Sequence, residues 1–412
     1  MQALVFDPPR VGWPLFKLAG LVRRAAAVGP LSGLRLREVS PPALPGPEWV
    51  RLRTLLGGIC GTDLALVAGR NHPATFLQRF ASFPAVLGHE NVCVVAETGS
   101  RVTRWRPGQR VCVDPALSCG PRGVVPVCVH CAAGRTSLCE NTDRGVLPPG
   151  LMIGLNAQTG GSWSAEFVAH ERQVFAVPDE IPDEHAVLTD PLACAVHAVL
   201  RRPPQTGEQV LLNGGGIMGV GLAAAIRALG CPNRVVGVVR HPFQADLLRR
   251  HGADDVRVHP RSMTHEDRYD DVARAVGGRR LAARFGNQAF VGGADLTYDS
   301  VGTGRSITDC LKWTAARGTL VLVGTSQISV VDTTPLWFAE LNVVGCNGRQ
   351  IEEVDGRRMH TYEVVFEWMR TGRLRVDGLL THRFALGDYR AALRALLARS
   401  DSHAVKAAFV PA

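Results

Sequence analysis

The sequence contains little lysine and no long apolar run. Only Lys17, Lys312 and Lys406 are lysines, so 43 of the 46 basic residues are arginines. These arginines scatter along the 412 residues instead of clustering with aromatic residues, which argues against a nucleic-acid interface despite the net charge of +9. A membrane-spanning helix requires an apolar run of about 18 residues, and no run in this sequence approaches that length. The N-terminal segment does not resemble a secretion signal either, and we expect a cytoplasmic protein.

Cysteine, in contrast, is abundant, and its spacing is uneven. Four of the eleven cysteines lie close together with the spacing C-x8-C-x2-C-x7-C, at Cys119, Cys128, Cys131 and Cys139. In a reducing compartment such a cluster indicates a metal site rather than disulfides. Four thiolates at short range predict a closed, structural zinc site. The alternative is a loop of unpaired cysteines.

The pattern of predicted elements changes along the chain. Short alternating segments near residues 3–6, 49–53, 92–96, 110–113 and 166–169 predict a β-rich region. After about residue 184, apolar strands alternate with helices, which predicts βαβ units and a parallel sheet. This pattern ends near Gly345. The segments 10–33 and 279–293 look like insertions.

A glycine-rich turn lies between a predicted strand at 209–213 and a predicted helix at 220–229. It satisfies G-x-G-x-x-G with Gly214, Gly216, Ile217, Met218 and Gly219. In this context the motif predicts a dinucleotide site, with the pyrophosphate at the helix N-terminus. The alternative is a structural glycine-rich turn.

The end of the next predicted strand has no carboxylate. An acidic residue there accepts hydrogen bonds from the ribose of NAD, whereas this chain has Arg240 and His241. A guanidinium at this position can pair with a 2′-phosphate, so we expect NADP to be preferred over NAD. Arg240 as a mere exposed strand-end residue is the alternative.

A third group of residues suits a catalytic metal. Cys60, Thr62 and Asp63 lie in one short segment, and His89 and Glu90 in another. Thiolate, imidazole and carboxylate suit zinc, which acts as a Lewis acid on an alcohol or a carbonyl. A buried cysteine and a satisfied histidine are the alternative.

Together these motifs resemble the zinc-dependent medium-chain dehydrogenase/reductase superfamily, over nearly the whole chain. Further matching segments are residues 45–50 before 59–63, 161–168, 190–193 with the sequence Asp-Pro-Leu-Ala, 380–384 and Lys406. The resemblance implies an α/β chain with a β-rich, GroES-like catalytic domain, 1–187 and 345–412, built from both ends. It implies a doubly wound Rossmann domain, 188–344, between them.

The resemblance also implies roles for individual residues. Cys60, His89 and Glu90 match metal ligands or close neighbours of the metal, and Asp190 matches a glutamate that approaches the metal in relatives. Thr62 matches the hydroxyl that relays the substrate proton. The histidine that continues this relay in some relatives is replaced by Ala65.

The expected activity is reversible hydride transfer between NAD(P), preferably NADP, and a secondary alcohol or ketone. A polyol, sugar, cyclitol or hydroxy-amino acid is the expected substrate class, by analogy. A homodimer or homotetramer is the expected assembly. Three alternatives are a zinc-free enone or quinone reductase, a catalytically silent dinucleotide-binding protein and a nucleic-acid binder.

Overall fold

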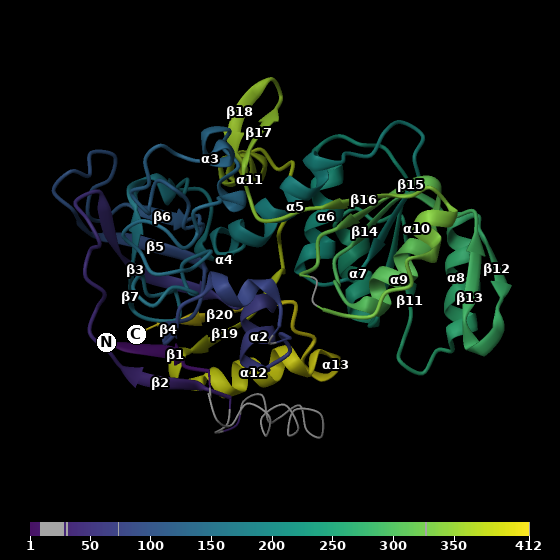
Figure 1. Cartoon of the computed structure of the whole chain (residues 1–412), viewed down its shortest axis with the longest axis horizontal. Helices are drawn as coiled ribbons and strands as arrows, with labels where there is room; N and C mark the ends of the chain where they lie inside the picture. Colours follow the sequence, from purple (N-terminus) through teal and green to yellow (C-terminus); the bar gives the residue numbers. More distant parts are fainter. Residues whose placement is uncertain (9–28, 30–31, 73, 326–327, 412) are drawn as a thin grey trace. The chain divides into compact units, whose positions relative to one another are not determined.

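The computed structural model describes residues 1–8, 29, 32–72, 74–325 and 328–411 (Figure 1). It divides into two compact units. Unit 1 comprises Met1–Asp190, Arg349–Arg370 and Asp377–Ala412, and unit 2 comprises Pro191–Gly348 and Thr371–Val376. The segment 10–33 lies largely outside the described residues. Across the described ranges, no helix is both long and apolar enough to cross a membrane.

Unit 1 is built on sheets whose strands pair mostly antiparallel, with one parallel pair near the C-terminus. The largest sheet has the order β19-β20-β3-β5-β6-β8, with β7 also paired to β3. Phe409 of the last strand pairs with Gly57 of β3, so the C-terminal strand joins a sheet built from the N-terminal half of the chain. The strands of unit 1 are β1 (Gln2–Phe6), β2 (Leu34–Glu38), β3 (Trp49–Gly58), β4 (Ala85–Val86), β5 (Glu90–Thr98), β6 (Arg110–Val113), β7 (Glu166–His170), β8 (Val174–Ala176), β17 (Ile351–Val354), β18 (Arg357–His360), β19 (Leu380–Ala385) and β20 (Lys406–Val410).

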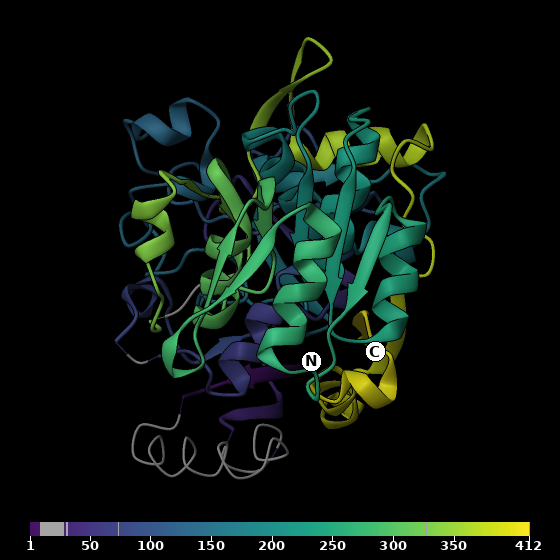
Figure 2. The same ribbon diagram turned by 90° about the vertical axis from the view of Figure 1, so that its right-hand side faces the viewer.

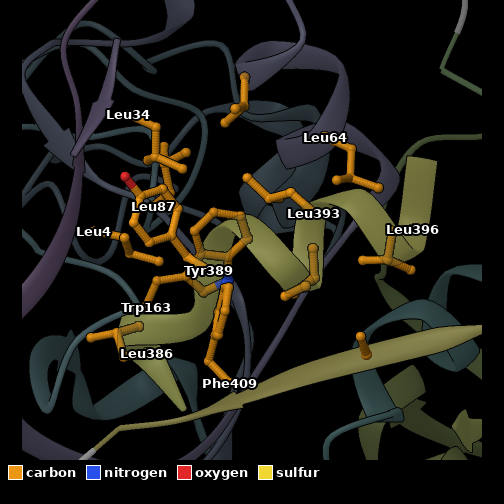
Figure 3. Close-up of a cluster of buried hydrophobic side chains, with 14 of the residues drawn as sticks. Leu4, Leu34, Leu64, Leu87, Trp163, Leu386, Tyr389, Leu393, Leu396 and Phe409 are labelled. Carbon is orange, nitrogen blue, oxygen red and sulfur yellow. The ribbon is translucent and has the colours of Figure 1, made fainter. Parts of the chain in front are cut away.

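The apolar core of unit 1 fixes the helix on which the metal-ligand candidates depend. Helix α2 (Gly61–Val67) directs Leu64 toward Leu393 and Leu396 of α12 (Tyr389–Leu397), above the buried ring of Trp163 (Figure 3). Because these side chains are buried together, the start of α2 is held rigidly. The other helices that begin in unit 1 are α3 (Val129–Ala132), α4 (Asp183–Ala186), α5 (Thr189–Arg201), α11 (Thr361–Arg370) and α13 (Arg399–Ser402).

Unit 2 contains a six-stranded parallel sheet with the order β11-β10-β9-β14-β15-β16. All five residues of β10 are buried, as expected for a parallel strand covered on both faces. The strand order reverses between β9 and β14, where doubly wound sheets bind their ligands. The strands are β9 (Val210–Asn213), β10 (Val235–Val239), β11 (Asp255–Val258), β14 (Ala294–Asp299), β15 (Thr314–Leu322) and β16 (Asn342–Gly345).

A separate hairpin, β12 (Arg279–Ala282) with β13 (Gln288–Val291), lies along α8 (His265–Val276) (Figure 2). It occupies the second predicted insertion, and its tip carries Phe285 fully exposed. The remaining helices of unit 2 are α6 (Ile217–Ala228), α7 (Pro242–Arg250), α9 (Gly304–Trp313) and α10 (Thr334–Phe338).

Candidate functional site

Three of the predicted metal ligands meet in unit 1. The ligand atoms of Cys60, His89 and Glu90 all lie within 4.8 Å of one another, and these three residues are called the Cys60 cluster below. Cys60 is the N-cap of α2, where its sulfur accepts a hydrogen bond from the Thr62 N–H at 3.5 Å. The cap fixes the Cys60 sulfur at the start of the helix, beside the ligand atoms of His89 and Glu90.

Two glycines allow the segment at residues 88–90 to approach its neighbours. Gly88 has φ +93°, and a Cβ there would lie 2.3 Å from the ring of Trp163. A Cβ on Gly58 would lie 2.4 Å from a carboxylate oxygen of Glu90. The Trp163 indole in turn donates to the Gly58 carbonyl at 2.9 Å. Glycine at both positions is therefore required to place His89 and Glu90 beside α2.

Asp63 orients the imidazole of the cluster. One of its oxygens accepts the Cys60 N–H at 3.1 Å, and the other lies 3.3 Å from His89 Nδ1. Carboxylate contact at Nδ1 leaves Nε2 available as a ligand, the arrangement common around metal-bound histidines. Burial opposes charge on His89, but Asp63 and Cys60 outweigh it and raise the pKa of the imidazole. The anionic groups around His89 therefore favour positive charge at this position.

Glu90 is buried beside Lys406, which forms an ion pair with its Oε2. Burial opposes the ammonium charge, but Glu90 outweighs it and raises the pKa of Lys406. Glu90 Oε1 has no hydrogen-bond partner among the described residues. An orphaned buried carboxylate oxygen next to a thiol and an imidazole fits a bound divalent metal.

The fourth expected ligand, Asp190, lies outside the Cys60 cluster in the described structure. Its Oδ1 lies 2.9 Å from Arg349 Nε and accepts a hydrogen bond from Tyr362 Oη at 2.8 Å. A direct metal–Asp190 bond stays a prediction that this geometry does not favour. Thr62 is half-buried in the first turn of α2, and Ala65 lies on the same helix.

The second cysteine group forms a compact loop, called the cysteine loop below. The sulfurs of Cys119, Cys128, Cys131 and Cys139 lie within 4.8 Å of one another. Backbone N–H groups point at them: those of Cys128, Cys131 and Asn141 donate to sulfurs at 3.4–3.5 Å. Burial opposes ionisation of Cys128, but backbone hydrogen bonds outweigh it and lower its pKa to about 7. This donor set fits a closed, four-thiolate zinc site.

The eight residues between Cys119 and Cys128 contain a fully buried arginine, Arg122. Its guanidinium donates five hydrogen bonds of 2.7–3.1 Å to backbone carbonyls, those of residues 117, 144, 147, 148 and 150. An arginine has five N–H donors, so all of them are satisfied. The eight-residue spacing thus contains an arginine whose hydrogen bonds stabilise the loop from its interior.

The predicted dinucleotide turn of unit 2 follows β9 and precedes α6. Gly214 has φ +114°, and a Cβ there would lie 2.3 Å from Ser300 Oγ, at the end of β14. A Cβ on Gly219 would lie 1.9 Å from the Gly214 carbonyl oxygen. Helix α6 begins at Ile217 with Gly216 as N-cap and no side-chain cap. Its first N–H groups are therefore left for an anion such as a pyrophosphate.

Arg240 and His241 follow β10 directly, at the carboxyl end of the sheet. The Arg240 side chain is exposed. The backbone N–H groups of both residues donate to Gln244 Oε1, at 3.2 and 3.1 Å. This contact fixes the turn, so a guanidinium lies where a NAD-specific chain would place a carboxylate.

The sequence did not identify Arg349, Tyr362 or Arg122 as contributors to these sites. The contact between Tyr362 and Asp190 spans 172 positions of the chain. No local motif marks such a pair. The sequence shows an arginine and two prolines between Cys119 and Cys128. It does not show which backbone carbonyls this arginine contacts.

Two family models match the chain. The alcohol dehydrogenase GroES-like domain matches residues 46–179, and the zinc-binding dehydrogenase domain matches residues 216–363. Together they assign a GroES-like fold to the β-rich part and a Rossmann-type fold to the parallel-sheet part. The α/β architecture with both domains, expected from the sequence, is confirmed.

Several relatives align over most of the chain. An L-idonate 5-dehydrogenase of Vitis vinifera is 30% identical over 366 residues, 87% of either chain. An L-threonine 3-dehydrogenase of Chelativorans sp. (strain BNC1) is 27% identical, covering 92% of this chain and 96% of its own. A zinc-binding dehydrogenase of Sinorhizobium meliloti 1021, solved with NADP, shares the fold with a TM-score of 0.70 at 24% identity, covering 93% and 98%. The chain belongs to the zinc-dependent medium-chain dehydrogenase/reductase superfamily.

Proposed function

We propose that the chain is a zinc-dependent alcohol dehydrogenase that prefers NADP and acts on a secondary alcohol or the matching ketone. The convergence of the Cys60 cluster, with an orphaned carboxylate oxygen on Glu90, carries the proposal. The glycine turn at Gly214 supports dinucleotide binding in the same chain. We assign the cysteine loop to a second, structural zinc.

When bound, zinc would supply Lewis-acid polarisation of the substrate oxygen, and a nicotinamide would exchange the hydride. The side chains of the protein would bind the metal, orient its ligands and transfer the proton. Cys60, His89 and Glu90 would hold the metal, and Asp63 keeps the imidazole in the orientation that exposes Nε2. Thr62, two residues after Cys60, would receive the hydroxyl proton of the alcohol. Because its neutral hydroxyl can accept and donate in sequence, it suits a relay.

Two features support a proposal for the substrate class: the names of the relatives and the Asp-Pro-Leu-Ala segment at residues 190–193. L-idonate, L-threonine and 2R,3R-butanediol, named for three relatives, all carry secondary hydroxyl groups. We propose a polyol, sugar, cyclitol or hydroxy-amino acid. The eleven cysteines, none in a disulfide within the described residues, suit the reducing cytoplasm.

The test is turnover of a panel of such alcohols with NADP⁺, followed as NADPH formation. The zinc-loaded protein should turn over at least one, lose activity after chelation and regain it with zinc. Metal-independent reduction of enones or quinones would instead indicate the zinc-free alternative. NADPH binding without any turnover would indicate a silent binding protein.

Thr62 should be needed for the proton step. Thr62→Val is expected to lower kcat about 10²-fold or more, because the relay hydroxyl is lost. Thr62→Ser should retain most activity, and both variants should keep the metal content of the wild type. Steady-state kinetics with metal analysis checks this, and a Thr62→Val enzyme as active as Thr62→Ser would remove Thr62 from the mechanism.

Arg240 should set the cofactor preference. Arg240→Ala is expected to raise KM for NADP about 10–100-fold, because a charge-assisted contact to the 2′-phosphate is worth about 1.5–3 kcal/mol. KM for NAD should change little. Arg284, exposed on the β12–β13 connection, gives a control variant, Arg284→Ala. Equal effects of Arg240→Ala on both cofactors would contradict the assignment.

Unit 2 should carry the contact between subunits of a homodimer or homotetramer. Strand β16 is at the edge of the parallel sheet, with Val343 42% exposed. Trp337 (80% exposed) and Phe338 (72%) of α10 lie just before it in the chain. Such an apolar edge is typical of an interface. Trp337→Asp should lower the mass in light scattering toward that of one chain, and Phe285→Asp should not; an unchanged mass for Trp337→Asp would place the interface elsewhere.

A further inference from the structure

A buried network of polar and charged side chains surrounds Asp190. Besides its contact with Asp190, Arg349 Nε lies 3.0 Å from Asp114 Oδ1. The other oxygen of Asp114 lies 3.3 Å from His360 Nε2, and the Tyr362 hydroxyl donates to Asp190 Oδ1. All five side chains are buried. One guanidinium therefore serves two buried carboxylates, and without it part of the buried negative charge would lose its cationic partner.

The cysteine loop fixes the backbone of Arg349. Ser137 Oγ donates to the Arg349 carbonyl at 2.8 Å and accepts its N–H at 3.1 Å. Two residues on, the Ile351 N–H donates to the Gly134 carbonyl at 3.1 Å. Because these hydrogen bonds hold the backbone at Arg349 and at Ile351, the position from which the Arg349 side chain reaches Asp190 is fixed.

A chain of hydrogen bonds links Asp190 to the backbone of the Cys60 cluster. Tyr362 Oη, which bonds Asp190, also lies 3.1 Å from the Val113 carbonyl oxygen. Asn91 Nδ2 donates to that carbonyl at 3.2 Å and to the His89 carbonyl at 3.1 Å. The Asp190 oxygens still lie outside the cluster. The Oδ1 atom already accepts a hydrogen bond from the Tyr362 phenol and forms an ion pair with the Arg349 guanidinium, and contacts that involve a charged partner are among the stronger ones available.

We propose that Arg349 is a positioning residue that keeps the Asp190 carboxylate from binding the metal of the Cys60 cluster. One coordination position then stays open for substrate. The inference rests on the proposed function. It differs from the expectation that Asp190 is a ligand, and it makes the cysteine loop, through Ser137, a support of the catalytic site as well as of the fold.

The test measures how fast excess dipicolinate removes zinc from the full-length protein. The phase that disappears in Cys60→Ser identifies the Cys60 cluster. Asp190→Asn should release this zinc at the wild-type rate, within about twofold, because no ligand is lost. Arg349→Met frees Asp190 to bind the metal, so release should slow about tenfold, the scale of outer-residue effects on metal affinity. Adding Asp190→Asn to Arg349→Met should restore the wild-type rate.

Milder variants keep the test informative if Arg349→Met does not fold. Tyr362→Phe and Ser137→Ala should slow release in the same direction, by less. Thr136→Val is a matched control, because the neighbouring Thr136 hydroxyl is buried without a partner in the described structure. Faster release from Asp190→Asn, or no slowing in any of the Arg349, Tyr362 and Ser137 variants, would overturn the inference. A wild-type protein without a Cys60-dependent phase would overturn the proposed function itself, and the inference with it.

Discussion

Replacing Cys60 with serine should abolish turnover while leaving the fold intact. Serine is a preferred N-cap residue, so α2 should begin as it does with Cys60, which already caps the helix through its sulfur. A serine hydroxyl, however, is neither soft nor ionised at neutral pH, and zinc bound by thiolate would be lost. Lewis-acid stabilisation is worth several kcal/mol, so kcat/KM should fall about 10³-fold or more.

The measurement is kcat/KM together with thermal unfolding. Cys231→Ser is a suitable control, because Cys231 is half-buried in unit 2 and outside both metal-ligand groups. The Cys60→Ser variant should unfold within a few degrees of the control. Activity comparable to that of Cys231→Ser would show that the chemistry does not depend on a metal at Cys60.

Arg122→Met should cause the largest loss of stability. Methionine is similar in size to the side chain but takes the guanidinium away from five carbonyl oxygens, of which that of Pro148 keeps Asn156 Nδ2 as a donor at 2.8 Å. Buried groups that lose a charged hydrogen-bond partner cost about 1–3 kcal/mol each, and relaxation and water recover part of this, so about 3–5 kcal/mol is expected in total. The cysteine loop should lose its metal more readily as well.

Denaturant unfolding and zinc content would check this prediction. Arg106→Met is the control, since Arg106 is exposed in the same unit. Arg122→Lys should fall between the two, because an ammonium keeps the charge but has only three donors. If Arg122→Met unfolds at the same denaturant concentration as Arg106→Met, the guanidinium is not the support that its contacts indicate.

The elements that could be predicted from the sequence are those with a local signal. The strand at Val210–Asn213, the glycine turn and α6 follow one another within about twenty residues, and each has its own pattern. Cys119 could be grouped with the other three cysteines because metal-ligand spacing is itself a local feature.

The rest depends on contacts between distant positions. Arg349 reaches Asp114 across 235 positions of the chain, and the helix that carries Tyr362 shows only an amphipathic pattern. Contacts between residues so far apart in the chain produce no periodic pattern, so they cannot be predicted from a single sequence. For the same reason Asp190 could be placed by resemblance near the metal, but its partner could not be named.

Zinc content per chain tests the central claim most directly, measured on protein purified without added metal. The wild type should hold about two zinc ions, one in the Cys60 cluster and one in the cysteine loop. Cys60→Ser should lose one together with activity, and Cys131→Ser should lose the other and mainly stability. One zinc that only Cys131→Ser removes, or no zinc at all, would contradict a zinc-dependent alcohol dehydrogenase.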